Sequence, residues 1–204
     1  LIFLYYPFIQ NIINSFQHIK YMGTAADKWN APFYKNYLEI FKDPKMLIAL
    51  KNTGIMIIAT IVGEVGLAIV LSLLVSNIKK GAGFFRVVYF FPIVISATAL
   101  GLLFNLVFLY DKGMINQLLQ LIGVLDAGKN ELIDWKATHP MFTMLVPVIW
   151  QYVGFYFIIL LTGLSGIPEE LYEAASIDGA TKFQRARYIT LPLLRNSICT
   201  CVVL

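Results

Sequence analysis

Apolar residues gather along the chain in long runs that contain almost no charge. Two runs, residues 87–109 and 140–164, carry no Asp, Glu, Lys or Arg. A third run, residues 52–78, carries one ionisable side chain, Glu64, near its middle. Each run exceeds the roughly 20 residues that a helix needs to cross a hydrocarbon layer of about 30 Å. The pattern therefore predicts three complete membrane spans.

Two shorter apolar stretches, about residues 1–17 and 191–204, lie at the two ends of the chain. We expect them to be parts of two further spans, so that the sequence is a fragment truncated at both ends. The runs are continuous and rich in Leu, whereas strands of a membrane barrel alternate in polarity. The expected fold class is therefore all-α: one polytopic transmembrane helical bundle, with three complete and two partial spans, over residues 1–204.

The composition supports a membrane protein and excludes a soluble enzyme. Hydrophobic residues make up 58% of the 204 residues and charged residues 14%, against about 45–50% and about 25% in soluble domains. The net charge of +4 comes from basic residues that are spread over four loops. This distribution favours membrane lipid as the surroundings and no nucleic acid as a partner. Because Lys and Arg occur on both sides, their counts do not decide the orientation.

Residues that could perform catalysis or hold a metal are scarce. Glu64 is the only ionisable residue inside the three complete spans, so no acid pair or activated nucleophile is available there. His18 and His139 lie at the ends of spans with only Asp134 close to either in sequence, which is too few ligands for zinc. We expect no catalytic residues and no metal site.

One segment imitates a phosphate-binding loop. Gly123, Gly128 and Lys129 match its glycines and lysine, but Asn130 stands where the loop needs Ser or Thr. The preceding residues look like a short amphipathic helix, whereas the motif follows a buried strand. We therefore expect a turn here and no nucleotide cofactor in this chain, so that any nucleotide must be bound by another subunit.

Three polar side chains inside the spans are candidates for a substrate path. A carboxylate at the bilayer centre is costly unless it faces water or a partner, which makes Glu64 a functional candidate. Asn105 and Gln151 lie in the next two spans and are able to hydrogen-bond a polar solute. The alternative for Asn105 and Gln151 is hydrogen bonding between helices, and for Glu64 it is an ion pair with a partner subunit.

The most informative stretch is the polar segment of residues 165–190. Pro168 suits a first helical position, and the two glutamates after it favour the positive end of a helix dipole. Gly179 predicts the end of that helix, and Thr181 with Gln184 predicts a capping box for the next one. The pattern indicates two short helices with a surface of small residues that suits close docking by another protein. A solvated linker is the alternative. The apolar residues of the first helix fall roughly on one side: Leu171, Ala174, Ala175 and Ile177.

The same segment resembles the EAA motif, E-A-A-x-x-x-G-x(9)-I-x-L-P, of binding-protein-dependent ABC importer permeases, and the fuller form EAASIDGA resembles their sugar branch. The matching residues are Glu173, Ala174, Ala175, Gly179, Ile189, Leu191 and Pro192. Other segments are similar to the family in the same order: Asn36-Tyr37 to Asn52-Thr53, Phe85-Arg86 with Phe91-Pro92, and Trp150 with Gly154. The resemblance covers nearly the whole chain.

The resemblance implies a multi-pass permease subunit of the ABC type I importer fold in a bacterial or archaeal cytoplasmic membrane. The implied partners are an ABC ATPase dimer, which holds ATP and Mg²⁺, a second homologous permease subunit and an extracytoplasmic solute-binding protein. The implied cargo is a sugar, oligosaccharide or related polyol. The loop of residues 165–190 and residues 79–86 are then cytoplasmic, whereas residues 20–51 and 110–140 lie outside.

Carried onto this sequence, the resemblance assigns ATPase coupling to six residues: Glu173, Ala174, Ala175, Asp178, Gly179 and Ala180. A different hypothesis is an ion-coupled secondary transporter in which Glu64 titrates and residues 165–190 form only a loop. Secondary carriers do not need a docking insertion and usually carry more ionisable groups inside the membrane, which favours the importer.

Overall fold

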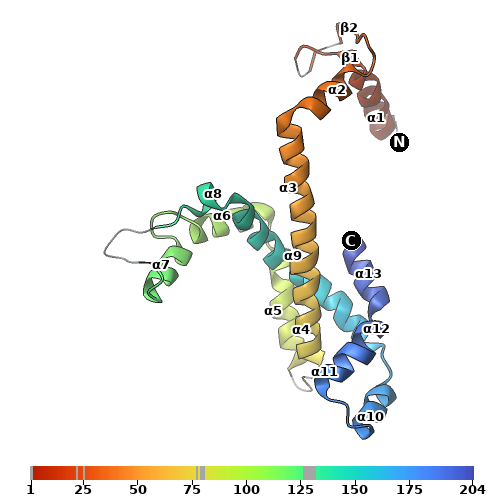
Figure 1. Cartoon of the computed structure of the whole chain (residues 1–204), viewed down its shortest axis with the longest axis vertical. Coiled ribbons are helices and arrows are strands. Elements are labelled where there is room, and N and C mark those ends of the chain that lie inside the picture. The colour runs from red at the N-terminus through yellow and green to blue at the C-terminus, as the bar shows by residue number, and fades with distance from the viewer. Residues whose placement is uncertain (1, 22, 25, 77, 79–80, 126–131) are drawn as a thin grey trace. The chain divides into compact units, whose positions relative to one another are not determined.

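The computed structural model describes the whole chain except residues 1, 22, 25, 77, 79–80 and 126–131 (Figure 1). It divides into two compact units, Leu1–Gly54 and Ile55–Leu204, which are described separately. That the two units act as one permease domain stays a prediction.

The first unit is small and mainly helical. Its elements are α1 (Ile2–Ser15), β1 (Gln17–His18), β2 (Lys28–Trp29), α2 (Lys35–Lys42) and the beginning of α3 (Pro44–Thr60). The two short strands pair antiparallel, a small departure from the all-α prediction.

The Asn36-Tyr37 pair makes contacts within the first unit to residues about 20 positions earlier in the chain. Asn36 Nδ2 donates to the backbone oxygens of Ser15 and Gln17, at 2.9 and 3.0 Å. The Tyr37 hydroxyl lies 2.7 Å from Ser15 Oγ, and its ring packs against Phe16. Asn36 and Tyr37 therefore join α2 to the end of α1.

The second unit contains the remaining helices. In chain order they are the π-helix η1 (Ile61–Val65), α4 (Gly66–Ser76), α5 (Ala82–Phe90), the 3₁₀ helix η2 (Phe91–Val94), α6 (Ala97–Val107), α7 (Met114–Leu121), α8 (Trp135–Thr138), α9 (Pro140–Ser165), α10 (Glu169–Ile177), α11 (Lys182–Arg185), the π-helix η4 (Ala186–Thr190), α12 (Leu191–Leu193) and α13 (Arg195–Val203).

Two of the predicted spans are confirmed as long helices. The continuous helix Pro44–Ser76, formed by α3, η1 and α4, has 33 residues, and α9 has 26 residues. The first begins eight residues before the predicted start at residue 52. Both are long and apolar enough to cross a membrane.

The third predicted span, residues 87–109, is not one straight helix. The helical stretch Ala82–Val94 is followed by Ala97–Val107 at a bend of 98°, so the prediction of a third complete span holds only if this bent pair counts as one span. Pro92 lacks a backbone N–H, and Ile95 is extended. Ser96 then caps α6 by accepting a hydrogen bond from the backbone nitrogen of Ala99.

The core of the second unit lies where α4, α9 and the helices after η4 meet. Its buried residues are Val65, Ala68, Val75, Val153, Phe157, Leu160, Leu161, Leu164, Leu194 and Cys201. Helices α5 and α9 touch through their backbones, because a Cβ built on Gly154 would lie 1.7 Å from the Tyr89 carbonyl oxygen. Glycine at this position of the predicted W-x-x-x-G motif therefore sets how closely the two helices pack.

Candidate coupling interface

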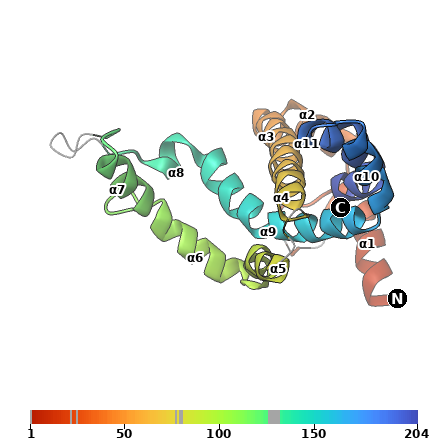
Figure 2. The same ribbon diagram turned by 90° about the horizontal axis from the view of Figure 1, so that it is seen from below.

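Helix α10 forms the first part of the loop that the sequence assigns to coupling. The sequence predicts Pro168 as the first helical residue. In the structure Pro168 is the N-cap residue, so the helix begins one residue later, at Glu169. Glu169 and Glu170 occupy the first turn, where their charge is favourable at the positive end of the helix dipole. Figures 1 and 2 show α10 and α11 beside the ends of α4 and α9.

The turn after α10 is a Schellman motif. Gly179 has a φ of +76°, a conformation that costs little for glycine and more for residues with a Cβ. Its backbone nitrogen donates to Ser176 O at 3.1 Å, and the nitrogen of Ala180 donates to Ala175 O at 2.9 Å. These two bonds satisfy carbonyls at the end of α10 and fix the direction of the chain. The predicted role of Gly179 as a helix stop is confirmed.

The next helix begins with the predicted capping box. Thr181 Oγ1 accepts from the backbone nitrogen of Gln184, at 3.3 Å, and Gln184 Oε1 accepts from the backbone nitrogen of Thr181, at 2.8 Å. Helix α11 then passes directly into the π-helix η4, whose last residue, Thr190, is buried.

Two side-chain hydrogen bonds join α10 to the helices that follow it. The Tyr172 hydroxyl lies 3.1 Å from Thr190 Oγ1. Because that hydroxyl of Thr190 donates to Arg185 O, Tyr172 is the donor. Four residues further along α10, Ser176 Oγ accepts from Arg185 Nη1 at 2.9 Å. We call Tyr172, Ser176, Arg185 and Thr190 the clasp, because they close α10 onto the segment that leads into α12.

The clasp defines which side of α10 faces outward. Ala175 lies between the two clasp residues of α10 and is only 9% exposed. Glu173, Ala174, Asp178 and Gly179 are exposed, and Ala180 is half-buried. Thus Ala175, one of the six predicted contact residues, faces into the chain in this structure. Leu171, Ala174, Ala175 and Ile177 lie within about half of the circumference of α10, as the sequence predicts, but of the four only Ala175 is buried.

Among the exposed apolar side chains of the loop are two that were not predicted to be contact residues. Ile177 is 86% exposed and Phe183 is 73% exposed. Their exposure depends on which face of each helix the clasp turns inward, so no local signal identified them.

Two of the three predicted substrate-path residues, Gln151 and Asn105, make hydrogen bonds within the second unit. Gln151 Nε2 donates a hydrogen bond to Ile95 O, at 3.1 Å. This bond gives a partner to a carbonyl at the bend before α6. The Asn105 side chain accepts from Lys136 Nζ on the neighbouring α8. Both amides therefore make the contacts within the bundle that the alternative interpretation expects.

Glu64 differs from the two amides. It lies in the π-helix η1, is 6% exposed and has no hydrogen bond or ion pair within the part of the chain that the structure describes. Of the three, Glu64 alone remains without a structural role.

Two further predictions concern the segment that resembles a phosphate-binding loop and the possibility of a metal site. The helix predicted before Gly123 is confirmed as α7, whereas the predicted turn at residues 126–128 lies outside the described residues. Among the residues with described positions, no group of three His, Cys, Asp or Glu side chains is close enough to hold a metal ion.

Sequence comparison identifies the family. A model for the binding-protein-dependent transport system inner membrane component family matches residues 65–204, which include the whole segment with the clasp. The chain belongs to this family. The predicted relationship to permeases of this type is therefore confirmed, and so is a membrane location for the chain.

Individual relatives are permease proteins. YurN of Bacillus subtilis (strain 168), a probable ABC transporter permease protein, is 33% identical over 100% of this chain and 69% of its own length. AraP of Halalkalibacterium halodurans, from an arabinooligosaccharides transport system, is 34% identical over 94% of this chain and 58% of its own. NgcF of Streptomyces coelicolor, from a diacetylchitobiose uptake system, is 31% identical over 99% and 59%. The chain thus spans 58 to 69% of the length of these relatives.

The fold also matches a solved transporter. A chain of a bacterial ABC transporter involved in the import of the acidic polysaccharide alginate aligns with 100% of this chain and 66% of its own length. The TM-score is 0.79 at 23% sequence identity. This likeness confirms the importer permease fold.

Proposed function

We propose that the chain is the larger part of a permease subunit of an ATP-driven, binding-protein-dependent importer for a sugar, oligosaccharide or related polyol. In this proposal residues 165–190 dock onto a separate ATPase. When the ATPase closes, they transmit its movement to the membrane helices. The chain itself performs no chemistry, and ATP with Mg²⁺ belongs to the ATPase.

The observation that carries the proposal is the construction of the loop. A Schellman turn, a capping box and the clasp fix α10 to the start of the next membrane segment. A solvated linker needs none of these bonds. A helix fixed in this way moves together with α12 when something pushes on its outer face, which is what mechanical coupling requires.

The outer face has the chemistry of a docking surface. Exposed Ile177 and Phe183 offer apolar anchors, and exposed small residues beside them allow close approach. Glu173 and Asp178 are available to pair with basic residues of the partner. We therefore assign the contact to Glu173, Ala174, Ile177, Asp178, Gly179 and Phe183, which we call the docking face. Ala175 supports it from inside.

The cargo and the remaining partners follow from the relatives. Those named for their cargo include systems for arabinooligosaccharides, diacetylchitobiose and lactose, which supports a carbohydrate. A related structure holds an alginate transporter in complex with a pentasaccharide-bound periplasmic protein, which supports an extracytoplasmic binding protein for this chain. A second permease subunit completes the bundle in a bacterial or archaeal cytoplasmic membrane, with the docking face inside the cell.

The test compares one substitution at two exposed alanines in the full-length protein. Ala174→Trp adds a large side chain to the docking face, and Ala137→Trp adds the same side chain to α8, which precedes the opposite end of α9. We expect Ala174→Trp to reduce co-purification of the ATPase by about fivefold or more, since overpacking a close contact costs about 1–3 kcal/mol. Ala137→Trp should leave it unchanged. Equal co-purification with both variants would contradict the proposal.

The alternative of an ion-coupled secondary transporter can be tested by substitution of Glu64. Its burial without a described partner is the one observation that favours a titrating carboxylate. Glu64→Gln removes the charge while keeping the shape. If ATP drives uptake, the variant still needs ATP and ignores an imposed ion gradient. Uptake by the wild type that is driven by an ion gradient without ATP would favour the alternative.

A further inference from the structure

A groove opens where the ends of the membrane helices meet the coupling loop. It lies within the second unit, has a volume of about 590 Å³ and is lined by residues of α4, α5, α9, α10, α11 and η4. The clasp residues Tyr172, Arg185 and Thr190 form part of its wall, but the docking face does not. The groove is therefore a separate feature from the surface assigned to the ATPase.

The charged side chains around the groove are mostly basic. Arg86 of α5, Lys182 of α11 and Arg185 line it, against the single carboxylate of Glu169. Arg86 and Lys182 make no ion pair or hydrogen bond within the described part of the chain. Arg185 uses Nη1 for Ser176, and its guanidinium has further N–H donors. The groove thus holds an excess of positive charge with unused donors.

Several of the other lining residues are apolar, and some of these lie in the last turns of two long helices. Val75 lies one residue before the end of α4, and Leu161 and Leu164 lie in the last turns of α9. The hydroxyls of Ser76 and Ser165 mark the ends of the same helices and also line the groove. A groove that combines apolar side chains with basic and hydroxyl groups has the mixed polarity found at the boundary between acyl chains and headgroups.

We infer that this groove binds the phosphate headgroup of an anionic membrane phospholipid, with its acyl chains against α4 and α9. Arginine and lysine form short, charge-assisted hydrogen bonds to phosphate oxygens. A basic groove between helices at the membrane surface is the arrangement that holds acidic lipid headgroups. The inference depends on the membrane location and not on docking of an ATPase. A lipid in this position would contact the clasp residues Tyr172, Arg185 and Thr190, which line the groove, and would stabilise the clasp.

The experiment measures lipid retention by the purified full-length protein. Native mass spectrometry after titration with phosphatidylglycerol or phosphatidylcholine compares the wild type with the double variant Arg86→Gln/Lys182→Gln. These two residues are chosen because, among the residues with described positions, their side chains make no hydrogen bond or ion pair. Each basic residue near an anionic lipid surface contributes about fivefold, so we expect about 25-fold weaker retention of phosphatidylglycerol. Retention of phosphatidylcholine should be weak and unchanged.

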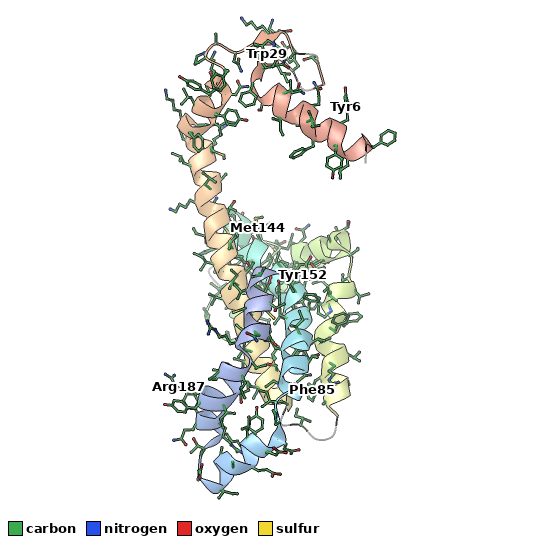
Figure 3. All side chains as sticks on the ribbon, turned by 90° about the vertical axis from the view of Figure 1, so that its right-hand side faces the viewer. Tyr6, Trp29, Phe85, Met144, Tyr152 and Arg187 are labelled. Atoms are coloured by element: carbon green, nitrogen blue, oxygen red, sulfur yellow. The ribbon has the colours of Figure 1, made fainter. Side chains whose placement is uncertain are left out.

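Arg187→Gln is the matched control. Arg187 belongs to the same loop but does not line the groove, and Figure 3 shows it and Phe85 of α5 on opposite sides of this end of the unit. The control should retain phosphatidylglycerol like the wild type. Equal loss with the control would overturn the inference in favour of diffuse surface charge. Displacement of the lipid by millimolar inorganic phosphate would overturn it in favour of a free-phosphate site. No loss in the double variant would also overturn it.

Discussion

Two polar segments of the second unit, one before α9 and one after it, are built in different ways. The segment that leads into α9 is organised by one buried side chain. Asn116 is 1% exposed, donates to the carbonyls of Tyr110 and Ile133, both at 3.0 Å, and accepts from Trp135 Nε1 at 2.9 Å. These bonds join residues up to 19 positions apart.

The segment after α9 depends on several shorter-range bonds. Its turn and its cap join residues three to five positions apart, and only the clasp reaches further, from Tyr172 to Thr190. The first segment should therefore lose much of its stability when Asn116 alone is changed. In the second segment, removal of any one side-chain hydrogen bond should cost little stability, whereas a change of the backbone turn at Gly179 should disrupt it. A loop that carries force benefits from the second construction, because no single side-chain hydrogen bond bears the whole load.

The largest expected effect comes from Gly179→Pro. Proline fixes φ near −65° and removes the N–H that donates to Ser176, so the Schellman turn cannot form. We expect membrane insertion to be retained and substrate-stimulated ATPase activity and uptake to fall by at least about a hundredfold, since the two helices lose their mutual orientation. Gly179→Asn, which tolerates a positive φ, should keep most of the activity. Full activity of the proline variant would contradict the role of the turn.

Asn116→Leu should destabilise the other segment strongly. The substitution removes three hydrogen bonds and leaves two carbonyls and one indole N–H without this partner, at a cost of about 2–4 kcal/mol. Limited proteolysis within residues 108–139 and thermal unfolding would measure it. Asn105→Leu, at an exposed amide with one partner, is the control and should cost less than about 1 kcal/mol. Similar losses of stability in both variants would contradict the claim that the segment before α9 depends on the side chain of Asn116.

The clasp should show a moderate and cooperative effect. Tyr172→Phe removes the donor and Thr190→Val removes the acceptor, each at about 1 kcal/mol. Because the two groups bond each other, the double variant should cost less than the sum, with a coupling energy of about 0.5–1.5 kcal/mol. Denaturation of the four proteins gives this energy, and the ratio of uptake to ATP hydrolysis should fall in the single variants. Additive effects would mean that the hydroxyls act independently.

The smallest effect is expected at the capping box. Thr181→Ala removes one cap and should cost about 0.5–1 kcal/mol, with uptake close to normal. Thr162→Ala removes a hydroxyl that only bonds the carbonyl of Ile158 in its own helix, and its stability should be unchanged within about 0.5 kcal/mol. A loss of uptake in Thr181→Ala as large as in Gly179→Pro would contradict the stepwise construction.

Features whose partners lie close in sequence were predictable. The ends of α10 and α11 follow from Gly179, Thr181 and Gln184, because caps and turns are closed by neighbours within a few residues. The two long spans follow from run length alone.

Features that depend on distant partners were not predictable. The run that contains Pro92 is as apolar as the others, and its bend is supported by Gln151, which lies 56 residues beyond the carbonyl that it binds. Asn116 looks like an ordinary residue of an amphipathic helix. Ala175 and Ile177 have no local signal that separates an inward from an outward face, because the clasp decides this.

The central claim is that the outer face of α10 contacts a separate ATPase while the inner face belongs to the fold. Two adjacent alanines test it, since Ala174 is exposed and Ala175 is buried. In a background without Cys199 and Cys201, each is replaced by cysteine in the assembled full-length transporter and treated with a short thiol-to-amine crosslinker. We expect a crosslink to the ATPase from Ala174→Cys and little or none from Ala175→Cys. A crosslink only from Ala175→Cys, equal crosslinks from both, or none from either would contradict it.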